Sequence, residues 1–263
     1  MRVLAIETST ARGSIALVGA GGLIAEAQAP APGAHLEWLA GAIADLLAAH
    51  DLTAAAIEGL AVSTGPGSFT GVRVGVVTAI TWAEATGTPV VGVPTLEAIA
   101  AGVAEEGAAA PLLLAAVDVR RGEVAAALFA LRGDARRLSP DVVARPADLP
   151  EMLSVPGALP VPDAVVLVAG DALERYGEAL LTAAGPGARV APRGQWWPRA
   201  RAVGRLGRAR LLAGARADPA TVQPVYPRRE VARIAGQQEP PAGGQNAGDG
   251  SGADWRPAPS PDP

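Results

Sequence analysis

The chain contains no cysteine and no lysine, and only 3% of its residues are aromatic. The absence of cysteine excludes disulfides, thiolate metal sites and cysteine nucleophiles. The absence of lysine excludes a Walker-type phosphate loop, which needs a lysine beside the phosphates. No apolar run approaches the roughly 18 residues that a membrane-spanning helix needs. Of the two histidines, His35 has Leu39 four residues later, so the helical His-x-x-x-His pair is missing and we expect no metal site.

What the chain does contain is a large apolar fraction, 49% of its 263 residues, mostly alanine, valine and leucine. This is enough to build one large domain or two lobes. The net charge of −4 argues against a general nucleic-acid binder. The arginines nevertheless cluster, with eleven of them and only two acids between Arg189 and Arg233. A strand begins at Arg2 with no secretory pattern before it, so we expect a cytoplasmic protein without membrane contact.

Strand-like and helix-like hydrophobic patterns alternate along the chain, which predicts an α/β fold. In each half, an apolar strand that ends in an acid, Glu7 or Asp118, is followed by a polar turn and a second strand. This shared order suggests duplicated α/β lobes, which we place at 1–108 and 109–235. Residues 236–263 contain almost no aliphatic side chain, so we expect a disordered tail there. The pattern predicts strands over 3–7, 14–18, 23–27, 60–63, 90–93, 112–118, 124–131 and 165–169, and helices over 35–49, 70–85, 95–104 and 199–213.

A glycine-rich segment from Gly65 to Gly75 joins an apolar strand to a helical pattern. Such a junction can present free N–H groups and the positive end of a helix dipole to an anion. The dinucleotide fingerprint fails because Thr70 occupies the place of its third glycine, and the nucleophile elbow fails because Pro66 and Thr70 flank Ser68 at the glycine positions. Two interpretations stay open, a phosphate-binding loop and a tight strand–helix turn with a serine cap.

Polar turns follow the first strand of each half. The hydroxyl cluster after Glu7 could hold a phosphate while the acid places Mg²⁺ or water, or it could be an ordinary solvated turn. In the second half, Asp118, Arg120 and Glu123 form the corresponding turn, or an ordinary hairpin ion pair. The candidate cofactor-binding residues are Glu7, Thr8, Ser9, Gly65, Gly67, Ser68, Thr70 and Gly71.

Arg201, Arg205 and Arg208 fall at helical spacing, in the arginine-rich region. They could contact the phosphates of an RNA backbone. The competing interpretation is a solvated helix face that pairs with acids elsewhere in the chain. The adjacent Trp196 and Trp197 fit a core or an interface better than a platform for base stacking.

Four segments resemble the TsaB (YeaZ) family: LAIETST at 4–10, GPGSFTGVRVG at 65–75, AAVDVRRGEVAA at 115–126 and PVYPRREVAR at 224–233. They stand in the family's order and spacing, and the resemblance runs from Met1 to about Arg233. It implies an actin-like, Hsp70-like (ASKHA) fold of two ribonuclease-H-like lobes. The chain departs from the family in its arginine-dense segment before residue 216 and in its long tail.

The resemblance also implies a function. TsaB proteins are non-catalytic scaffold or activator subunits that bind TsaD, the metal-containing transferase, with the ATPase TsaE joining the complex. The complex places a threonylcarbamoyl group on N6 of adenosine 37 in tRNAs that read codons beginning with A. We therefore expect no catalytic residue and no resident cofactor, although a nucleotide at the TsaD interface stays open. VAGDAL at 168–173 has a single glycine, so a nucleotide site in the second lobe looks eroded.

By similarity, the two helices 35–49 and 70–85 form the TsaD-binding surface, which could also make a homodimer in isolation. An aspartate at Val76 or Ile80 is then expected to abolish TsaD binding while the chain stays folded. The alternative function is an independent ATP-binding or ATP-hydrolysing enzyme, and a protease lacks a recognisable nucleophile–base pair. The expected partner-binding residues are His35, Leu39, Ala42, Ile43, Val72, Arg73, Val76, Ala79 and Ile80.

Overall fold

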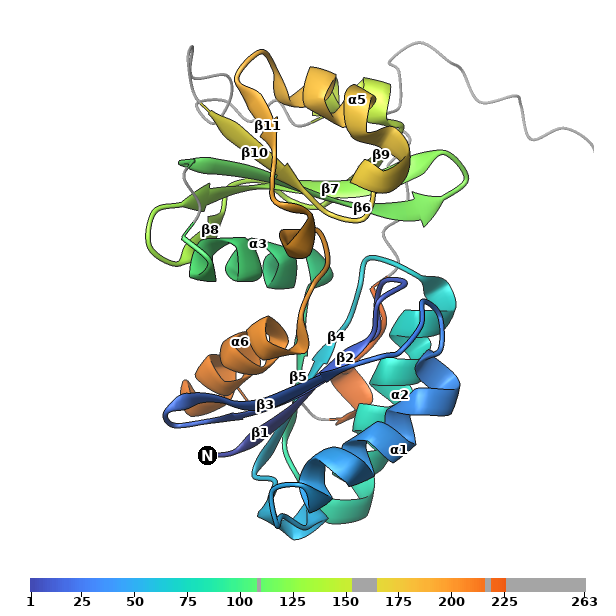
Figure 1. Ribbon diagram of the computed structural model, residues 1–263, viewed down its shortest axis with the longest axis vertical. Helices are drawn as coiled ribbons and strands as arrows, with labels where there is room; N and C mark the ends of the chain where they lie inside the picture. Colours follow the sequence, from blue (N-terminus) through green and yellow to red (C-terminus); the bar gives the residue numbers. More distant parts are fainter. Residues whose placement is uncertain (108–109, 153–164, 216–218, 226–263) are drawn as a thin grey trace, which may run out of the picture. The chain divides into compact units, whose positions relative to one another are not determined.

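The computed structural model describes residues 1–107, 110–152, 165–215 and 219–225, which all belong to one compact unit, Met1–Glu230. This unit contains two β-sheets with helices on their faces (Figure 1). Within the described ranges, no helix is long and apolar enough to cross a membrane. The predicted tail, 236–263, lies outside the described residues.

The first sheet has the strand order β3-β2-β1-β4-β5. Its central strand β1 is buried at every position, because it is flanked by β2 on one side and β4 on the other. The strands β1, β2 and β3 form an antiparallel meander, whereas β4 and β5 run parallel to β1. The bounds are β1 Val3–Glu7, β2 Ser14–Gly19, β3 Gly22–Gln28, β4 Gly59–Ser63 and β5 Val90–Val93.

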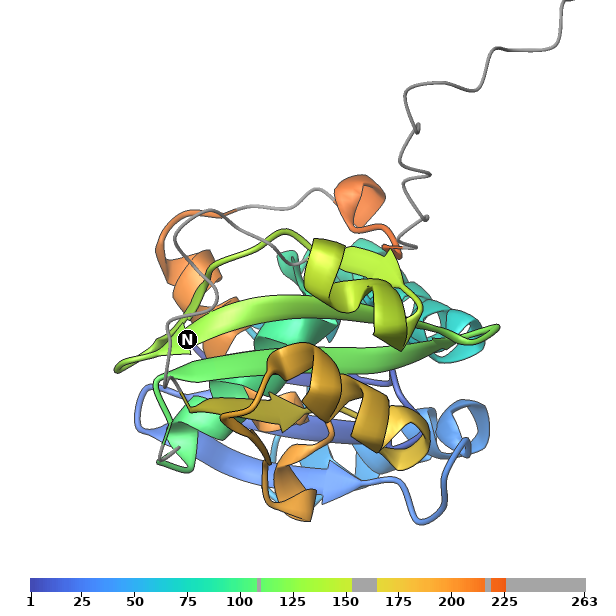
Figure 2. The same cartoon turned by 90° about the horizontal axis from the view of Figure 1, so that it is seen from above.

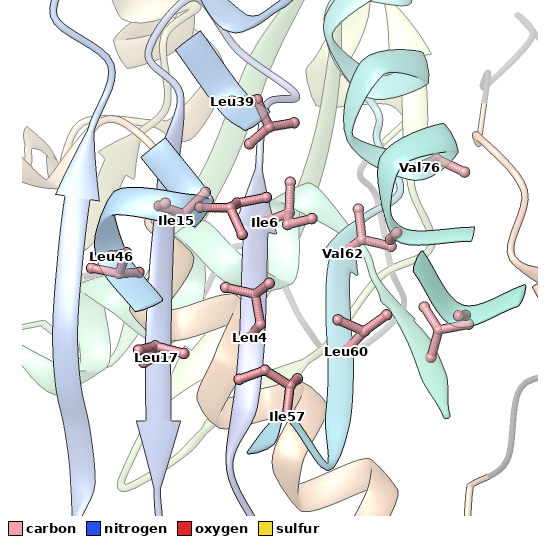
Figure 3. Close-up of a cluster of buried hydrophobic side chains, with 14 of the residues drawn as sticks. Leu4, Ile6, Ile15, Leu17, Leu39, Leu46, Ile57, Leu60, Val62 and Val76 are labelled. Carbon is pink, nitrogen blue, oxygen red and sulfur yellow. The ribbon is translucent and has the colours of Figure 1, made fainter. Parts of the chain in front are cut away.

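Helices cover both faces of this sheet because alternate residues of β1 point to opposite sides. Leu4 and Ile6 join the core beneath α1 (His35–Ala48) and α2 (Phe69–Thr86), as Figure 3 shows. On the opposite face, the neighbours of these residues in β1 pack with α6 (Ala200–Leu212). The helix α6 therefore comes from the far end of the sequence to complete the first sheet.

The second sheet has the order β11-β10-β6-β7-β8, with β9 also paired to β7. Its long hairpin β6–β7 is antiparallel, and β10 and β11 run parallel to β6. The helix α3 (Thr95–Glu105) packs on one face and α5 (Leu173–Ala184) on the other (Figure 1), and Figure 2 shows α5 in front of the sheet. The bounds are β6 Leu112–Arg120, β7 Glu123–Leu131, β8 Ala135–Arg137, β9 Val142–Ala144, β10 Val166–Ala169 and β11 Ala188–Val190, with the short helix α4 at Leu149–Met152.

Both sheets repeat one order, an antiparallel meander followed by parallel strands with connecting helices. This is the arrangement of two ribonuclease-H-like units, and the predicted α/β, actin-like fold is confirmed. Each sheet also takes a helix from the other half of the sequence, since α3 packs on the second sheet and α6 on the first. The predicted lobe boundaries, 1–108 and 109–235, stay predictions. Single helical turns lie at Ala54–Ala56, Pro146–Asp148, Arg193–Gln195 and Pro219–Thr221.

Candidate functional site

A buried carboxyl group stands at the end of β1. Glu7 is fully buried, and its Oε1 accepts hydrogen bonds from the backbone N–H and the hydroxyl of Ser9, each at 2.6 Å. Its Oε2 has no hydrogen-bond partner among the described residues. Burial raises the pKa of Glu7, the hydrogen bonds from Ser9 oppose this rise, and the charge of Asp171 adds to it. Glu7 is therefore a candidate for a proton-bearing or ligand-binding acid.

One acid of the second half, Asp171, lies within electrostatic reach of Glu7. Asp171, just after β10, accepts the backbone N–H of Asp118 at 3.0 Å. The pKa of Asp171 is raised to about 6, mainly by burial and also by the charge of Asp118, while the hydrogen bond from the Asp118 backbone opposes the rise. Asp118 in turn accepts the N–H of Arg120 at 2.7 Å, and the Arg120 guanidinium lies 3.8 Å from the same carboxylate. The predicted Asp118–Arg120 hairpin ion pair is thus present.

The substitution Asp171→Asn should remove a pH dependence of stability. The ordinary pKa of 3.8 rises to about 6 on folding, so the unfolded chain loses this proton first as the pH increases. The associated stability is full below pH 3.8 and is lost between pH 3.8 and about 6. Asparagine keeps an acceptor for Asp118 and carries no charge. We expect the variant to exceed the wild type by about 1–3 kcal/mol in unfolding free energy at pH 8 and to match it near pH 4. Urea unfolding at both pH values measures these free energies. An equal difference between the variant and the wild type at the two pH values would contradict the prediction.

The glycine-rich loop is packed against the polar turn after β1. The N–H of Ser68 donates to the carbonyl of Ser9 at 2.7 Å, and the hydroxyl of Thr8 donates to the carbonyl of Gly71 at 2.7 Å. A Cβ at Gly67 would lie 2.1 Å from the Ser9 carbonyl oxygen, and a Cβ at Gly71 would lie 2.1 Å from that of Thr8. These glycines therefore allow two backbone segments to approach each other closely.

The helix α2 begins with a serine cap, as one of the two interpretations of the loop predicts. The hydroxyl of Ser68 accepts the N–H of Gly71 at 3.3 Å. Gly65 has a φ of +97°, and a Cβ there would lie 2.7 Å from the carbonyl oxygen of Val225. Thr70 is exposed. The structure thus brings most of the candidate cofactor residues together, and hydrogen-bonding groups of Thr8, Ser9 and Ser68 are engaged within the chain. Their role in binding a cofactor stays a prediction.

Most of the residues predicted to contact a partner are turned toward the protein's own core. Leu39, Val72 and Val76 are at most 2% exposed and pack on the first sheet. His35 is buried as well, and its Nε2 lies 2.8 Å from the carbonyl of Thr10. The expectation that an aspartate at Val76 leaves the chain folded is therefore wrong, because the charge would enter the core. Ile43 and Ala79 are likewise buried, Ala42 and Ile80 are half-buried, and Arg73 is exposed.

A different set of side chains forms the exposed apolar part of these helices. Leu36 on α1 is 77% exposed, and Phe69 and Val77 on α2 are 56% and 59% exposed. Arg73 stands between the latter two at helical spacing, and its guanidinium lies 3.8 Å from the centroid of the Phe69 ring. Leu36, Phe69 and Val77 were not among the residues predicted from the sequence to contact a partner. The signal was their period, since Phe69, Arg73 and Val77 repeat every four residues along a stripe beside that of Val72 and Val76.

The arginines predicted to contact tRNA form interactions within the chain. Arg201 pairs with Glu106 at 2.6 Å, and Arg205 pairs with Glu105 and, at 3.2 Å, with Asp134. The third, Arg208, donates to the carbonyl of Met1, and a further arginine of α6, Arg210, pairs with Glu97. Pairing with acids elsewhere in the chain was the competing interpretation, and it describes Arg201 and Arg205. An RNA contact by Arg201, Arg205 and Arg208 stays a prediction.

Comparisons with known proteins agree with this architecture. YeaZ from Pseudomonas aeruginosa matches with a TM-score of 0.72 at 28% identity, covering 86% of this chain and 99% of that one. The TsaB proteins, whose full name is tRNA threonylcarbamoyladenosine biosynthesis protein TsaB, are 38% identical over 124 residues in Escherichia coli K12 and 35% identical over 155 residues in Bacillus subtilis. The chain belongs to the TsaB (YeaZ) family.

The extent of the matches differs between these relatives. The alignment with the Escherichia coli TsaB covers 47% of this chain and 53% of that protein, and the one with the Bacillus subtilis TsaB covers 58% and 66%. This TsaB-family chain thus spans about half to two thirds of the length of the curated relatives it matches. A family model described as TsaD: tRNA N6-adenosine threonylcarbamoyltransferase also matches residues 21–172, more than half of the chain.

Proposed function

We propose that this chain is a non-catalytic subunit that binds and activates a TsaD-type transferase. The reaction is the synthesis of N6-threonylcarbamoyladenosine at position 37 of tRNAs that read codons beginning with A. The names of the Escherichia coli and Bacillus subtilis relatives and the description of the matching family model support a role in this pathway. A TsaE-type ATPase joins the complex, and tRNA is reached through it.

The observation that carries this proposal is the exposed apolar surface of α1 and α2. These helices already bury one stripe on the first sheet, yet Leu36, Phe69 and Val77 stay more than half exposed. Exposed large apolar side chains that share a surface with a cation, here Arg73, are typical of protein–protein contacts. A second copy of the chain could cover the same helices when TsaD is absent.

The packing of the glycine-rich loop supports the non-catalytic assignment. Two backbone N–H groups of this loop, those of Ser68 and Gly71, already donate within the chain. The imidazole of His35 is directed at the carbonyl of Thr10. The sequence has no second histidine on that helix to build a metal pair. These features leave activation of another subunit as the function that fits best.

A reconstituted modification assay tests the proposal. We expect a TsaD and TsaE mixture to modify tRNA at least tenfold faster when this chain is added, and the chain alone to modify none. The measurement is the amount of N6-threonylcarbamoyladenosine released from digested tRNA. An unchanged rate with the chain present would contradict the activator role.

The buried acid at the end of β1 favours a second candidate, an independent ATP-hydrolysing enzyme. Glu7 keeps one carboxylate oxygen without a partner among the described residues, and the raised pKa values of Glu7 and Asp171 are typical of functional acids. This candidate requires the purified chain to bind ATP with micromolar affinity and to lose hydrolysis in Glu7→Gln. We expect calorimetry to detect no ATP binding by the chain alone.

A further inference from the structure

The described residues that line a small pocket beside the start of α6 include two arginines and no acid. Its volume is about 70 Å³, and its walls include Arg12, Gln28, Trp197 and Arg199. Arg12 lies in the turn before β2, Gln28 ends β3, and Arg199 immediately precedes α6. Residues distant in the sequence therefore bring two guanidinium groups to one place.

The two guanidinium groups lack the acidic partners that other arginines of this chain have. Arg137, Arg201 and Arg205 each form ion pairs. Neither Arg12 nor Arg199 forms one with any other described residue. Positive charge at this pocket is thus left without compensation by the described part of the chain, which favours an anion.

One of the two side chains, that of Arg12, is held in place by stacking. The Arg12 guanidinium lies 3.6 Å from the centroid of the Trp197 ring, and Trp197 is only 6% exposed. Stacking on an indole fixes the plane of a guanidinium and leaves its edge donors available. The Nε of Arg199 is buried and has no acceptor among the described residues. A guanidinium can only donate, so an acceptor is what this atom lacks.

The backbone N–H groups at the start of α6 do not provide the donors for an anion in this pocket. The N–H of Ala200 donates to the hydroxyl of Ser14 at 2.9 Å, and that of Arg201 donates to Glu26 at 3.3 Å. The N–H groups of the next two residues donate to the carbonyl of Arg199. Recognition therefore depends on the side chains of Arg12 and Arg199.

We infer that this pocket binds one phosphate group of an RNA backbone, and this inference rests on the proposed role in tRNA modification. The planar donor fork of arginine matches the oxygens of a phosphate. A volume of about 70 Å³ leaves room for a small oxyanion beside the two arginines. The remainder of the ligand then lies outside the pocket, as it does for a phosphate within a polynucleotide.

Two binding measurements on the full chain test the site. In a titration at constant ionic strength, the ³¹P NMR resonance of inorganic phosphate should broaden with the wild type and not with the double variant Arg12→Gln/Arg199→Gln. Fluorescence anisotropy measures the binding of a tRNA transcript to the complex with TsaD. In the double variant this binding should weaken about tenfold, and the slope of log affinity against log salt concentration should fall in magnitude by about 1. Arg121→Gln, an exposed arginine on the β6–β7 turn, is the matched control for lost charge and should change neither.

The outcomes separate the possible sources of the phosphate. If the double variant loses both the ³¹P broadening and the tight tRNA binding, the RNA contact is supported. If it loses only the ³¹P broadening, the pocket binds a free oxyanion and the RNA contact is overturned. If neither signal changes, the pocket is no anion site. Arg12→Gln alters only an exposed side chain and tests the site even if the double variant unfolds. Arg12 and Arg199 lie on neither α1 nor α2, so replacing them should leave TsaD binding intact. TsaD co-purification, measured on the same samples, therefore reports separately whether the proposed function fails.

Discussion

Replacing Gly71 by alanine should lower the free energy of unfolding by about 2–4 kcal/mol. Gly71 lies in the first turn of α2, and its missing side chain leaves room for the backbone of Thr8. A Cβ would lie 2.1 Å from the Thr8 carbonyl oxygen and 3.3 Å from its carbon. Backbone atoms of a buried strand end cannot yield as a flexible side chain would, so either α2 or the turn after β1 must move.

The matched control is Gly41→Ala, because intrinsic helix propensity favours alanine over glycine by about 1 kcal/mol. Gly41 lies in α1, is exposed, and would place its Cβ in open space. We expect this variant to be more stable than the wild type by about 0.5–1 kcal/mol. Urea unfolding followed by circular dichroism gives both values. Equal, stabilising effects of the two substitutions would mean that the loop and the turn are not packed together, and would reopen the phosphate-binding interpretation.

An aspartate at Val76 should unfold the chain, whereas an aspartate at the adjacent Val77 should leave it folded. Val76 is 1% exposed and packs in the core of the first sheet, while Val77, about 100° further around α2, is 59% exposed. Burying an unpaired carboxylate costs at least about 4 kcal/mol, which is a large part of the stability of a domain. A surface substitution normally changes stability by less than about 0.5 kcal/mol.

The comparison of these neighbours needs only thermal unfolding and a far-ultraviolet spectrum. We expect Val77→Asp to keep the wild-type spectrum and a melting temperature within a few degrees of it, and Val76→Asp to lack a cooperative transition. Val76→Ala, which removes volume without adding a charge, should fold with an intermediate loss of stability. A folded Val76→Asp variant would show that the burial assigned to this side of α2 is wrong.

The sequence predicted the fold well where a hydrophobic period runs without interruption. The helices over 35–48 and 69–86 and the strands of the first sheet begin and end within two residues of their predicted positions. The helix α5 was missed, and a physical reason lies in its first turns. Tyr176 has non-helical dihedral angles of −123° and 20°, and Gly177 follows it, so the helical period breaks there. The strands β8, β9 and β11 were also missed, since three residues carry too little pattern.

The candidate site was harder to predict because burial depends on which face of a helix meets the sheet. Val72 and Val76 have the branched side chains that suit a helix interface, but the sheet already occupies that face. The arginines of α6 show a second limit. Arg205 pairs with Glu105, a hundred positions earlier in the sequence, and only the packing of α6 beside α3 brings them together. No local pattern marks which of two charged residues will be paired.

Binding of a TsaD-type transferase by the full chain and by Val77→Asp tests the central claim most directly. Isothermal titration calorimetry with purified TsaD measures it, and Gly41→Ala serves as the folded control variant. A charge placed in an apolar contact should cost at least about 1.4 kcal/mol, so we expect the affinity of Val77→Asp to fall tenfold or more. The control should bind as the wild type does. Equal affinity of Val77→Asp and wild type for TsaD would contradict the account, because the exposed side of α2 could then not be the surface that TsaD contacts.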